Sequence, residues 1–176
     1  MKDFIFIAGA PGSGKSSVAK VLQEKLNCPL FEFGWIPEFR NTGAKTIPYT
    51  EEESLAFENL VLVAKNYVKH GFKNVIITDL NNDYIEQLPS TFSDYNFAIY
   101  TLRVQDKETL KHRVLGGTRT SEYRDWEKAL EINELLQNRP ALHNEIFIDV
   151  DEQSINDIAD KILADLSGVA NRNLYE

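Results

Sequence analysis

The chain has 176 residues, a net charge of −8 and 43% hydrophobic residues. These values predict one globular domain with a full core, and they exclude a general nucleic-acid binder, which needs a strong basic excess. No apolar stretch approaches the length of about 18 residues that spans a membrane, so we expect a cytoplasmic protein with neither a membrane nor a nucleic-acid partner. Cys28 is the only cysteine, which excludes an internal disulfide and suits the cytosol. Its place before Pro29 and an apolar run predicts a buried core residue.

The first predicted element is a buried parallel strand over residues 4–8, an uninterrupted apolar run. It leads into Gly9-Ala10-Pro11-Gly12-Ser13-Gly14-Lys15-Ser16, which fits the phosphate-binding pattern G-x-x-x-x-G-K-[ST] at every fixed position. Apolar residues at helical spacing follow this motif: Val18, Val21, Leu22 and Leu26. Strand, loop and helix therefore stand in the order that a phosphate-binding loop requires.

Each residue type in this loop has a physical task. The glycines let the backbone curl so that successive N–H groups point inward at phosphate oxygens, and the start of the helix favours the anion further. The motif places Lys15 on the β- and γ-phosphates and the Ser16 hydroxyl on Mg²⁺. We therefore expect residues 9–16, together with Ser17, to bind ATP.

Further apolar runs predict four more strands, at residues 29–33, 74–78, 97–104 and 145–150. Helical patterns separate them, at 106–115, at 122–138 with Pro140 as its stop, and at 155–166. A further helix is expected to begin with a capping box of Thr50 and Glu53 and to end before Gly71. We expect one domain over residues 1–166, with an acceptor-side insert at about 35–70, and a tail over 167–176 that frays.

Strands that alternate with helices imply a five-stranded parallel sheet with helices on both faces, the three-layer α/β fold of P-loop NTPases. Right-handed crossovers bring the carboxyl ends of all strands to one edge. The phosphate loop lies at that edge, as do residues 32–35 after the second strand and 79–81 after the third. The reacting groups are therefore expected there.

Several P-loop classes are excluded by what the sequence lacks. There is no N-K-x-D for guanine, no L-S-G-G-Q of transporter ATPases, and no helical domain after the sheet as in AAA+ motors. The layout that remains resembles the nucleoside monophosphate kinase-like group, which includes adenylate, shikimate and gluconate kinases and chloramphenicol phosphotransferase. Three features carry the resemblance: the early phosphate loop, the insert after the second strand, and the arginine-rich segment at 101–124. The resemblance implies a kinase that uses ATP and Mg²⁺.

The resemblance also implies a short lid, at about residues 114–125, that closes over the transferring phosphoryl group. Arg119 and Arg124 would neutralise charge on its oxygens there, which is the main task in phosphoryl transfer. Arg113, just before the lid, would pack against the adenine. The alternative is that these arginines are solvated surface charges. His112, the neighbour of Arg113, is expected to be a surface residue.

The acceptor side has two carboxylates. Asp79, at the end of the third strand, is placed to order Mg²⁺ through water or to take a proton from an acceptor hydroxyl; the alternative is a turn cap. Glu32 ends the second strand, where metabolite kinases of this group often carry an aspartate, so this departure weakens a shikimate- or gluconate-kinase assignment. Strand alternation also leaves an outward surface glutamate open.

Trp35 and Arg40 follow in a loop-rich stretch, where an aromatic ring and a guanidinium suit a ring-bearing or anionic acceptor; Trp35 can equally pack in the core. A phosphate acceptor needs several positive groups, and Arg40 is the one arginine on this side. We therefore expect direct transfer of the γ-phosphoryl group of ATP to a small-molecule hydroxyl. A nucleoside monophosphate kinase and a non-catalytic ATP-binding module stay open, as does a monomer or a homodimer.

Overall fold

The computed structural model describes residues 1–35, 47–116 and 123–168. Its sheet confirms the predicted α/β class, with five parallel strands in the order β2-β3-β1-β4-β5. The strands are β1 (Phe4–Gly9), β2 (Leu30–Glu32), β3 (Val75–Thr78), β4 (Phe97–Arg103) and β5 (Glu145–Asp149). Because β1 occupies the middle of the sheet, the loop that follows it emerges at the centre of the carboxyl edge.

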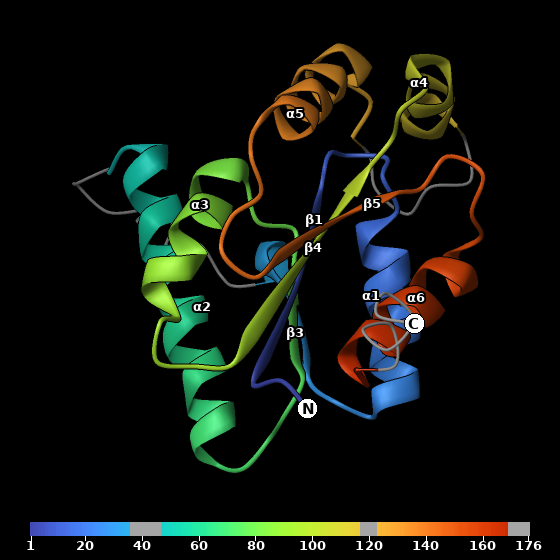
Figure 1. The fold of residues 1–176 in the computed structure, drawn as a ribbon. Coiled ribbons are helices and arrows are strands. Elements are labelled where there is room, and N and C mark those ends of the chain that lie inside the picture. Colours follow the sequence, from blue (N-terminus) through green and yellow to red (C-terminus); the bar gives the residue numbers. More distant parts are fainter. Residues whose placement is uncertain (36–46, 117–122, 169–176) are drawn as a thin grey trace.

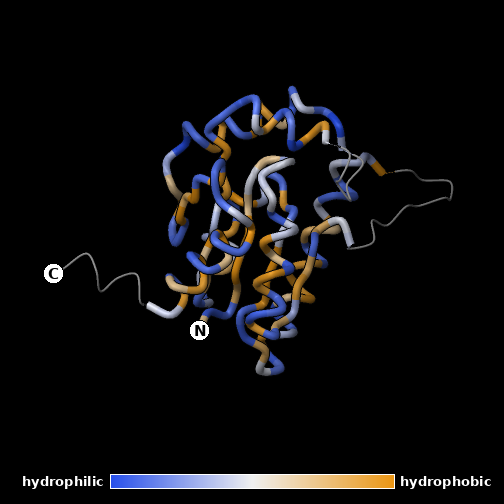
Figure 2. The backbone as a smooth tube through the Cα atoms, turned by 90° about the vertical axis from the view of Figure 1, so that its right-hand side faces the viewer, coloured by the Kyte–Doolittle hydropathy of each residue, from blue (hydrophilic) through white to orange (hydrophobic). Residues whose placement is uncertain are grey.

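Helices cover both faces of the sheet (Figure 1). Helices α1 (Lys15–Leu26) and α6 (Ile155–Leu166) pack on one face, and α2 (Tyr49–Lys69) and α3 (Asn82–Thr91) cover the other. Side chains alternate along β1, so that Ile5 and Ile7 pack toward α1 while Phe4 and Phe6 pack toward α3. Figure 2 shows the hydrophobic residues concentrated along the central strands.

Helices α4 (Lys107–Leu115) and α5 (Trp126–Asn138) lie beyond the carboxyl ends of the strands (Figure 1). A buried amide fixes α5 there: Asn133 Oδ1 accepts from Val104 N at 3.1 Å, and Asn133 Nδ2 donates to Val104 O at 2.7 Å. Since the oxygen and the nitrogen of a buried amide both need hydrogen-bond partners, these two bonds hold α5 at a fixed position over the sheet. The two helices flank the segment in which the lid is predicted.

Two elements differ from the sequence-based expectation on the acceptor side. Strand β2 ends at Glu32, and residues 33–35 turn into a short 3₁₀ helix, η1 (Phe33–Trp35). Helix α3 was not expected, because its polar start and Pro89 obscure the stripe formed by Ile85 and Leu88. The helix forms because Asn81 caps it, accepting from Tyr84 N at 3.1 Å, and because the stripe is buried against the sheet.

Two helix starts were also predicted wrongly. Helix α2 begins at Tyr49 with Pro48 before it, so Thr50 lies inside the first turn and forms no capping box. Helix α5 begins at Trp126 rather than at 122, because the Asp125 side chain accepts from Lys128 N at 2.9 Å and caps the helix there. Its end before Pro140 is as expected.

Cys28 is buried, as predicted, and burial raises the pKa of its thiol to about 11, which leaves it uncharged and unreactive. Across the described parts of the chain, no helix combines the length and apolarity that a membrane crossing requires.

Candidate active site

The phosphate loop curls tightly between β1 and α1. Gly9 and Gly12 adopt positive φ angles of 142° and 92°. A Cβ on Gly9 would lie 2.7 Å from Leu102 O, and one on Gly12 would lie 2.8 Å from Val114 Cγ2. Glycine is therefore required at both positions for conformation and for space. The loop rests directly on β4 and α4, and this close packing holds its curled backbone in place.

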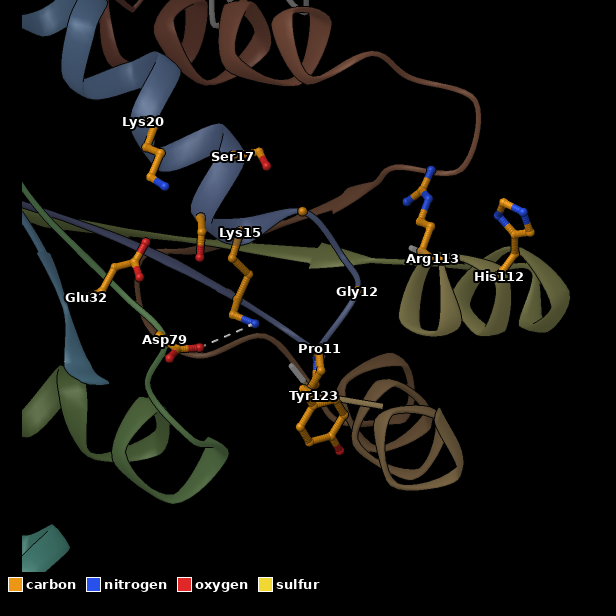
Figure 3. Close-up of a pocket in the computed structure, with 13 residues that line it drawn as sticks. Pro11, Gly12, Lys15, Ser17, Lys20, Glu32, Asp79, His112, Arg113 and Tyr123 are labelled. Atoms are coloured by element: carbon orange, nitrogen blue, oxygen red, sulfur yellow. Dashed lines mark ion pairs between the residues drawn. The ribbon is translucent and has the colours of Figure 1, made fainter. Parts of the chain in front are cut away.

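Lys15 lies at the mouth of this loop with a side chain that is only 10% exposed. Its Nζ donates to Ala10 O at 3.3 Å and lies 3.9 Å from Asp79 Oδ1, the ion pair drawn in Figure 3. At 3.9 Å, and with Asp79 half exposed, this pair is a weak stabiliser. It serves instead to place the ammonium between the loop and the end of β3.

A cavity of about 700 Å³ opens beside Lys15. Its walls come from the phosphate loop, the start of α1, the ends of β2 and β3, and α4 (Figure 3). The lining residues are Pro11, Gly12, Gly14, Lys15, Ser16, Ser17, Lys20, Glu32, Asp79, His112, Arg113, Gly116 and Tyr123. The fold therefore gathers most of the predicted nucleotide residues and both predicted carboxylates in one cavity.

Glu32 and Asp79 lie at the end of the cavity where the acceptor is predicted to bind. Asp79 has a left-handed backbone, with φ 69°, which is uncommon for a residue other than glycine. Its Oδ2 lies close to Gly34, where an added Cβ would be 3.8 Å away. Glu32 lines the cavity rather than the outer surface, and its Oε1 is buried with no hydrogen-bond partner among the described residues. A buried carboxylate oxygen without a partner is costly unless a ligand supplies one.

The opposite end of the cavity is formed by α4. Arg113 Nη2 donates to Val150 O and to Asp151 O, each at 2.9 Å, which fixes its guanidinium at the cavity wall. His112 lies beside Arg113 (Figure 3), and Tyr123, within the predicted lid segment, also lines the cavity. His112 is exposed, as expected of a surface residue, and in addition it borders the cavity.

Outside the phosphate loop, two predicted site residues do not line the cavity, and two more lie outside the described residues. Arg124 is exposed, its Nη1 donates to Tyr123 O at 2.9 Å, and it is not among the lining residues. Trp35 is 56% exposed, which contradicts the core-packing alternative, and it does not line the cavity either. Arg40 and Arg119 lie outside the described residues, so their roles stay predictions.

Lys20 lines the cavity but was not predicted to do so, and Gly116 and Tyr123 line it although they were predicted only as part of the lid. For Lys20 a signal existed: it follows Ser16 by four residues, so both lie on one face of α1, and helical side chains lean toward the N-terminus. Figure 3 shows the Lys20 side chain directed back toward the cavity. Tyr123 lies in the segment predicted as the lid, just before α5, but the sequence does not single it out within that segment.

The donor set fits Mg²⁺ bound together with nucleotide phosphates. No cluster of three or more His, Cys, Asp or Glu side chains suited to a metal occurs among the described residues. Mg²⁺ in kinases needs none, because it takes most of its oxygens from phosphates and water and only one or two from the protein. The Ser16 hydroxyl and the Asp79 and Glu32 carboxylates supply such oxygens. The buried Ser13 hydroxyl, which has no hydrogen-bond partner within the described chain, suits a phosphate oxygen.

Solved structures of similar fold agree with the resemblance drawn from the sequence. A gluconokinase from Sinorhizobium meliloti 1021 has a TM-score of 0.65 and 20% identity, covering 97% of this chain and 94% of its own. A sugar kinase from Janibacter sp. HTCC2649 has a TM-score of 0.67 and 19% identity, covering 93% and 94%. A shikimate kinase from Acinetobacter baumannii in complex with shikimate has a TM-score of 0.55 and 20% identity, covering 94% and 93%. At these identities the likeness establishes the fold.

Sequence comparison gives the family. No curated protein matches the sequence. The model of a family described as an AAA domain matches residues 5–134, which include the phosphate loop, β1 to β4 and most of α5. This description names the domain and no motor activity, so the exclusion of an AAA+ motor stays a prediction. The chain belongs to this AAA domain family of P-loop proteins, and its fold is that of the small P-loop kinases.

Proposed function

We propose that this protein is an ATP- and Mg²⁺-dependent kinase that transfers the γ-phosphoryl group to a hydroxyl of a small molecule. One observation carries the proposal: a single cavity joins the phosphate loop and Lys15 to the two carboxylates at the ends of β2 and β3. The loop and Lys15 suit a nucleoside triphosphate, and the two carboxylates suit an acceptor that must lose a proton.

In the proposed reaction, different residues bind the phosphates, the metal and the acceptor hydroxyl. The loop amides and Lys15 bind the β- and γ-phosphates, and Ser16 holds Mg²⁺, which neutralises charge on the transferring group. Asp79, next to Lys15, orders the metal through water or accepts the hydroxyl proton, and Glu32 is the second candidate for that proton. Transfer is direct and in line, and needs no covalent phospho-enzyme.

The lid completes the transition state in this proposal. Lid arginines close over the phosphoryl group and supply positive charge where the β–γ bond breaks. Arg119 and Arg124 are the candidates, and Arg124 does not line the cavity in the described structure. Closure also excludes water, which limits wasteful hydrolysis of ATP.

The acceptor class follows from the charges at its end of the cavity. Two carboxylates favour a hydroxyl over a phosphate acceptor, which carries negative charge already and would be repelled. Lys20 at the same end suits an acceptor with an anionic group beside its hydroxyls. Gluconokinase, sugar kinase and shikimate kinase neighbours support a hydroxylated acceptor. A nucleoside monophosphate kinase is the second candidate, favoured by the overall layout.

An ADP-release screen tests the proposal. The panel contains hydroxy acids, neutral sugars, nucleosides, hydroxylated antibiotics and nucleoside monophosphates, each with Mg²⁺ and ATP. We expect ADP release above the no-acceptor rate with at least one hydroxylated compound, and no such increase with Lys15→Ala. Stimulation by nucleoside monophosphates alone would instead establish the second candidate. Tight ATP binding without turnover in any arm would point to a non-catalytic ATP-binding module.

A further inference from the structure

The segment that follows β5 is tied to the start of α4 by one carboxylate. Asp151 Oδ2 accepts from Gln105 N at 2.9 Å, and Asp151 Oδ1 accepts from Asp106 N at 2.9 Å. Both oxygens are therefore used, each on a backbone N–H of the turn between β4 and α4. Bonds of this kind to an ionised acceptor are stronger than those between neutral groups, and they fix the backbone on both sides.

The same segment holds the other end of α4 through its carbonyls. Arg113, in the last turn, donates from Nη2 to both Val150 O and Asp151 O at 2.9 Å. Figure 3 shows Arg113 extending from α4 toward the chain that follows β5. Asp151 thus contributes its side chain to one end of α4 and its backbone to Arg113 at the other.

Helix α4 itself does not depend on these bonds for its place. Leu110 and Val114 are 1% and 0% exposed and anchor the helix in the core, and Asp106 caps it by accepting from Thr109 N. Val150 is also held, because its side chain is 0% exposed and its N donates to Arg103 O at 3.0 Å. Loss of the Asp151 carboxylate therefore releases residue 151 and the peptide group that carries Val150 O, rather than the helix. The carbonyls that orient Arg113 then lose their fixed direction, while the phosphate loop keeps its support from Val114.

We infer that Asp151 is a positioning residue for the nucleotide base, acting through Arg113. Its carboxylate holds the two carbonyls that aim the Arg113 guanidinium along the cavity wall, where a planar cation can lie against a base. The inference rests on the proposed binding of ATP in this cavity. It assigns Asp151 to the base and not to the triphosphate.

Two ligands separate these parts of the nucleotide. Isothermal titration calorimetry would measure the Kd of Mg·ATP and of Mg·tripolyphosphate, which carries the phosphates without a base. In Asp151→Asn one acceptor oxygen becomes an NH₂ group that faces a backbone N–H. We expect the Kd of ATP to rise about five- to tenfold, the scale of one lost hydrogen bond, and that of tripolyphosphate to change less than twofold. Asp160→Asn, which removes an exposed pair with Lys25, should alter neither.

The double variant Asp151→Asn with Arg113→Ala tests the route of action. If Asp151 acts through Arg113, the double variant should bind ATP no worse than Arg113→Ala alone. Additive losses, equal weakening of both ligands, or unchanged ATP binding in Asp151→Asn would overturn the inference. Should Asp151→Asn not fold, Arg113→Ala must still show the loss confined to ATP, or the inference fails. A wild-type protein that binds tripolyphosphate and ATP equally refutes the inference but not the phosphate site, whereas binding of neither refutes the proposed function.

Discussion

At the scale of single residues, the chemistry depends on how Lys15 and Asp79 are held. Lys15 is buried against Ala10 O, and Asp79 projects from a left-handed backbone at the end of β3. Neither feature stabilises the folded chain, because a buried ammonium and a positive φ both cost free energy. Residues that cost folding free energy in this way are commonly found at ligand-binding sites, which is consistent with a phosphate site here.

The first prediction concerns Lys15. Lys15→Ala should cost at least about 1–3 kcal/mol of ATP binding or transition-state stabilisation, the scale of a charge-assisted contact. ATP affinity by calorimetry and turnover by ADP release would measure this loss. Lys25→Ala, which removes an exposed lysine in the last turn of α1 that pairs with Asp160 of α6, is the matched control. Equal affinity and turnover in wild type and Lys15→Ala would contradict the account.

The second prediction separates the roles of Asp79. Asp79→Asn keeps the shape and removes the charge, so it should reduce transfer by about 10²–10⁴-fold while leaving ATP affinity largely intact, as expected for a proton acceptor. Parallel calorimetry and single-turnover kinetics would distinguish binding from chemistry. Loss of Mg·ATP affinity would place Asp79 on the metal instead. If Glu32→Gln shows the larger loss of transfer, the proton acceptor is Glu32.

The sequence allowed the strand, loop and helix around residues 9–16 to be predicted, because the motif is contiguous, and nucleotide binding there stays a prediction. It allowed Asp79 and Glu32 to be predicted as well, since each ends a strand of a parallel sheet and such ends share one edge. His112 and Tyr123 were not singled out as cavity residues, because their places there depend on how the segments around them pack over that edge.

At the scale of elements, α4 and α5 act as a pair that carries the predicted lid. Lys111 Nζ lies 4.4 Å from the centre of the Trp126 ring, so the middle of α4 contacts the start of α5. Asn133 fixes α5 to β4, and Asp151 and Arg113 fix the segment after β5 to α4. The two ends of the lid segment therefore start from rigid supports, which is what a closing lid requires.

The third prediction concerns the arginines of this lid. Because they would act mainly in the transition state, Arg119→Ala or Arg124→Ala should lower kcat more than it raises the KM for ATP. Steady-state kinetics on the acceptor found by the screen would test this, with Lys128→Ala, an exposed lysine of α5, as control. Unchanged kcat in both arginine variants would show that they are solvated surface charges.

Helices were predictable to different degrees for a physical reason. Helix α6 carries a clear apolar stripe and a capping box of Ser154 and Asp157, so pattern and cap agree. In α3 the cap and the apolar stripe favour a helix whereas Pro89 disfavours one, and the helix forms because its stripe is buried against the sheet. Thr50 and Glu53 match a capping box in sequence, yet α2 begins one residue earlier, at Tyr49. Pro48 occupies the N-cap position, and proline is favoured at helix starts because it has no N–H that needs a partner.

At the scale of the whole molecule, one buried ion pair joins the end of α5 to β5. Arg139 donates from Nη2 to Glu145 Oε1 and from Nη1 to Oε2, both at 2.6 Å, and the Glu145 side chain is fully buried. Burial raises the pKa of Glu145, but hydrogen bonds from Arg139, Leu142 N and Thr101 outweigh that effect and hold the pKa below its ordinary value of 4.5. The ionised form is therefore the one that the fold stabilises.

The fourth prediction follows from the direction of this shift. Since the folded-state pKa lies below the unfolded value, Glu145 stabilises the fold fully above pH 4.5, and that contribution is lost as the pH falls through the folded-state pKa. Glu145→Gln should lower the free energy of unfolding at pH 7 by about 3–5 kcal/mol, the cost of breaking a buried pair. It should also flatten the loss of stability in acid.

Denaturant titrations from pH 3 to pH 7 would measure both effects. Glu131→Gln, which removes an exposed pair with Lys128, is the control and should change neither. Some acid sensitivity should remain in Glu145→Gln, because other carboxyls also have lowered pKa values: Asp3, Asp106 and Asp157. An unaltered pH profile in Glu145→Gln would show that the pair does not contribute through ionisation.

The central claim is that this P-loop cavity transfers a phosphoryl group to a small hydroxylated molecule. The most direct measurement follows the label from [γ-³²P]ATP in wild-type protein, with the acceptor that most increases ADP release. We predict that the label appears in a phosphate ester of that acceptor, at a rate matching ADP release, and that Lys15→Ala abolishes its appearance. Label found only in inorganic phosphate, or only in ATP, would contradict the assignment as a kinase.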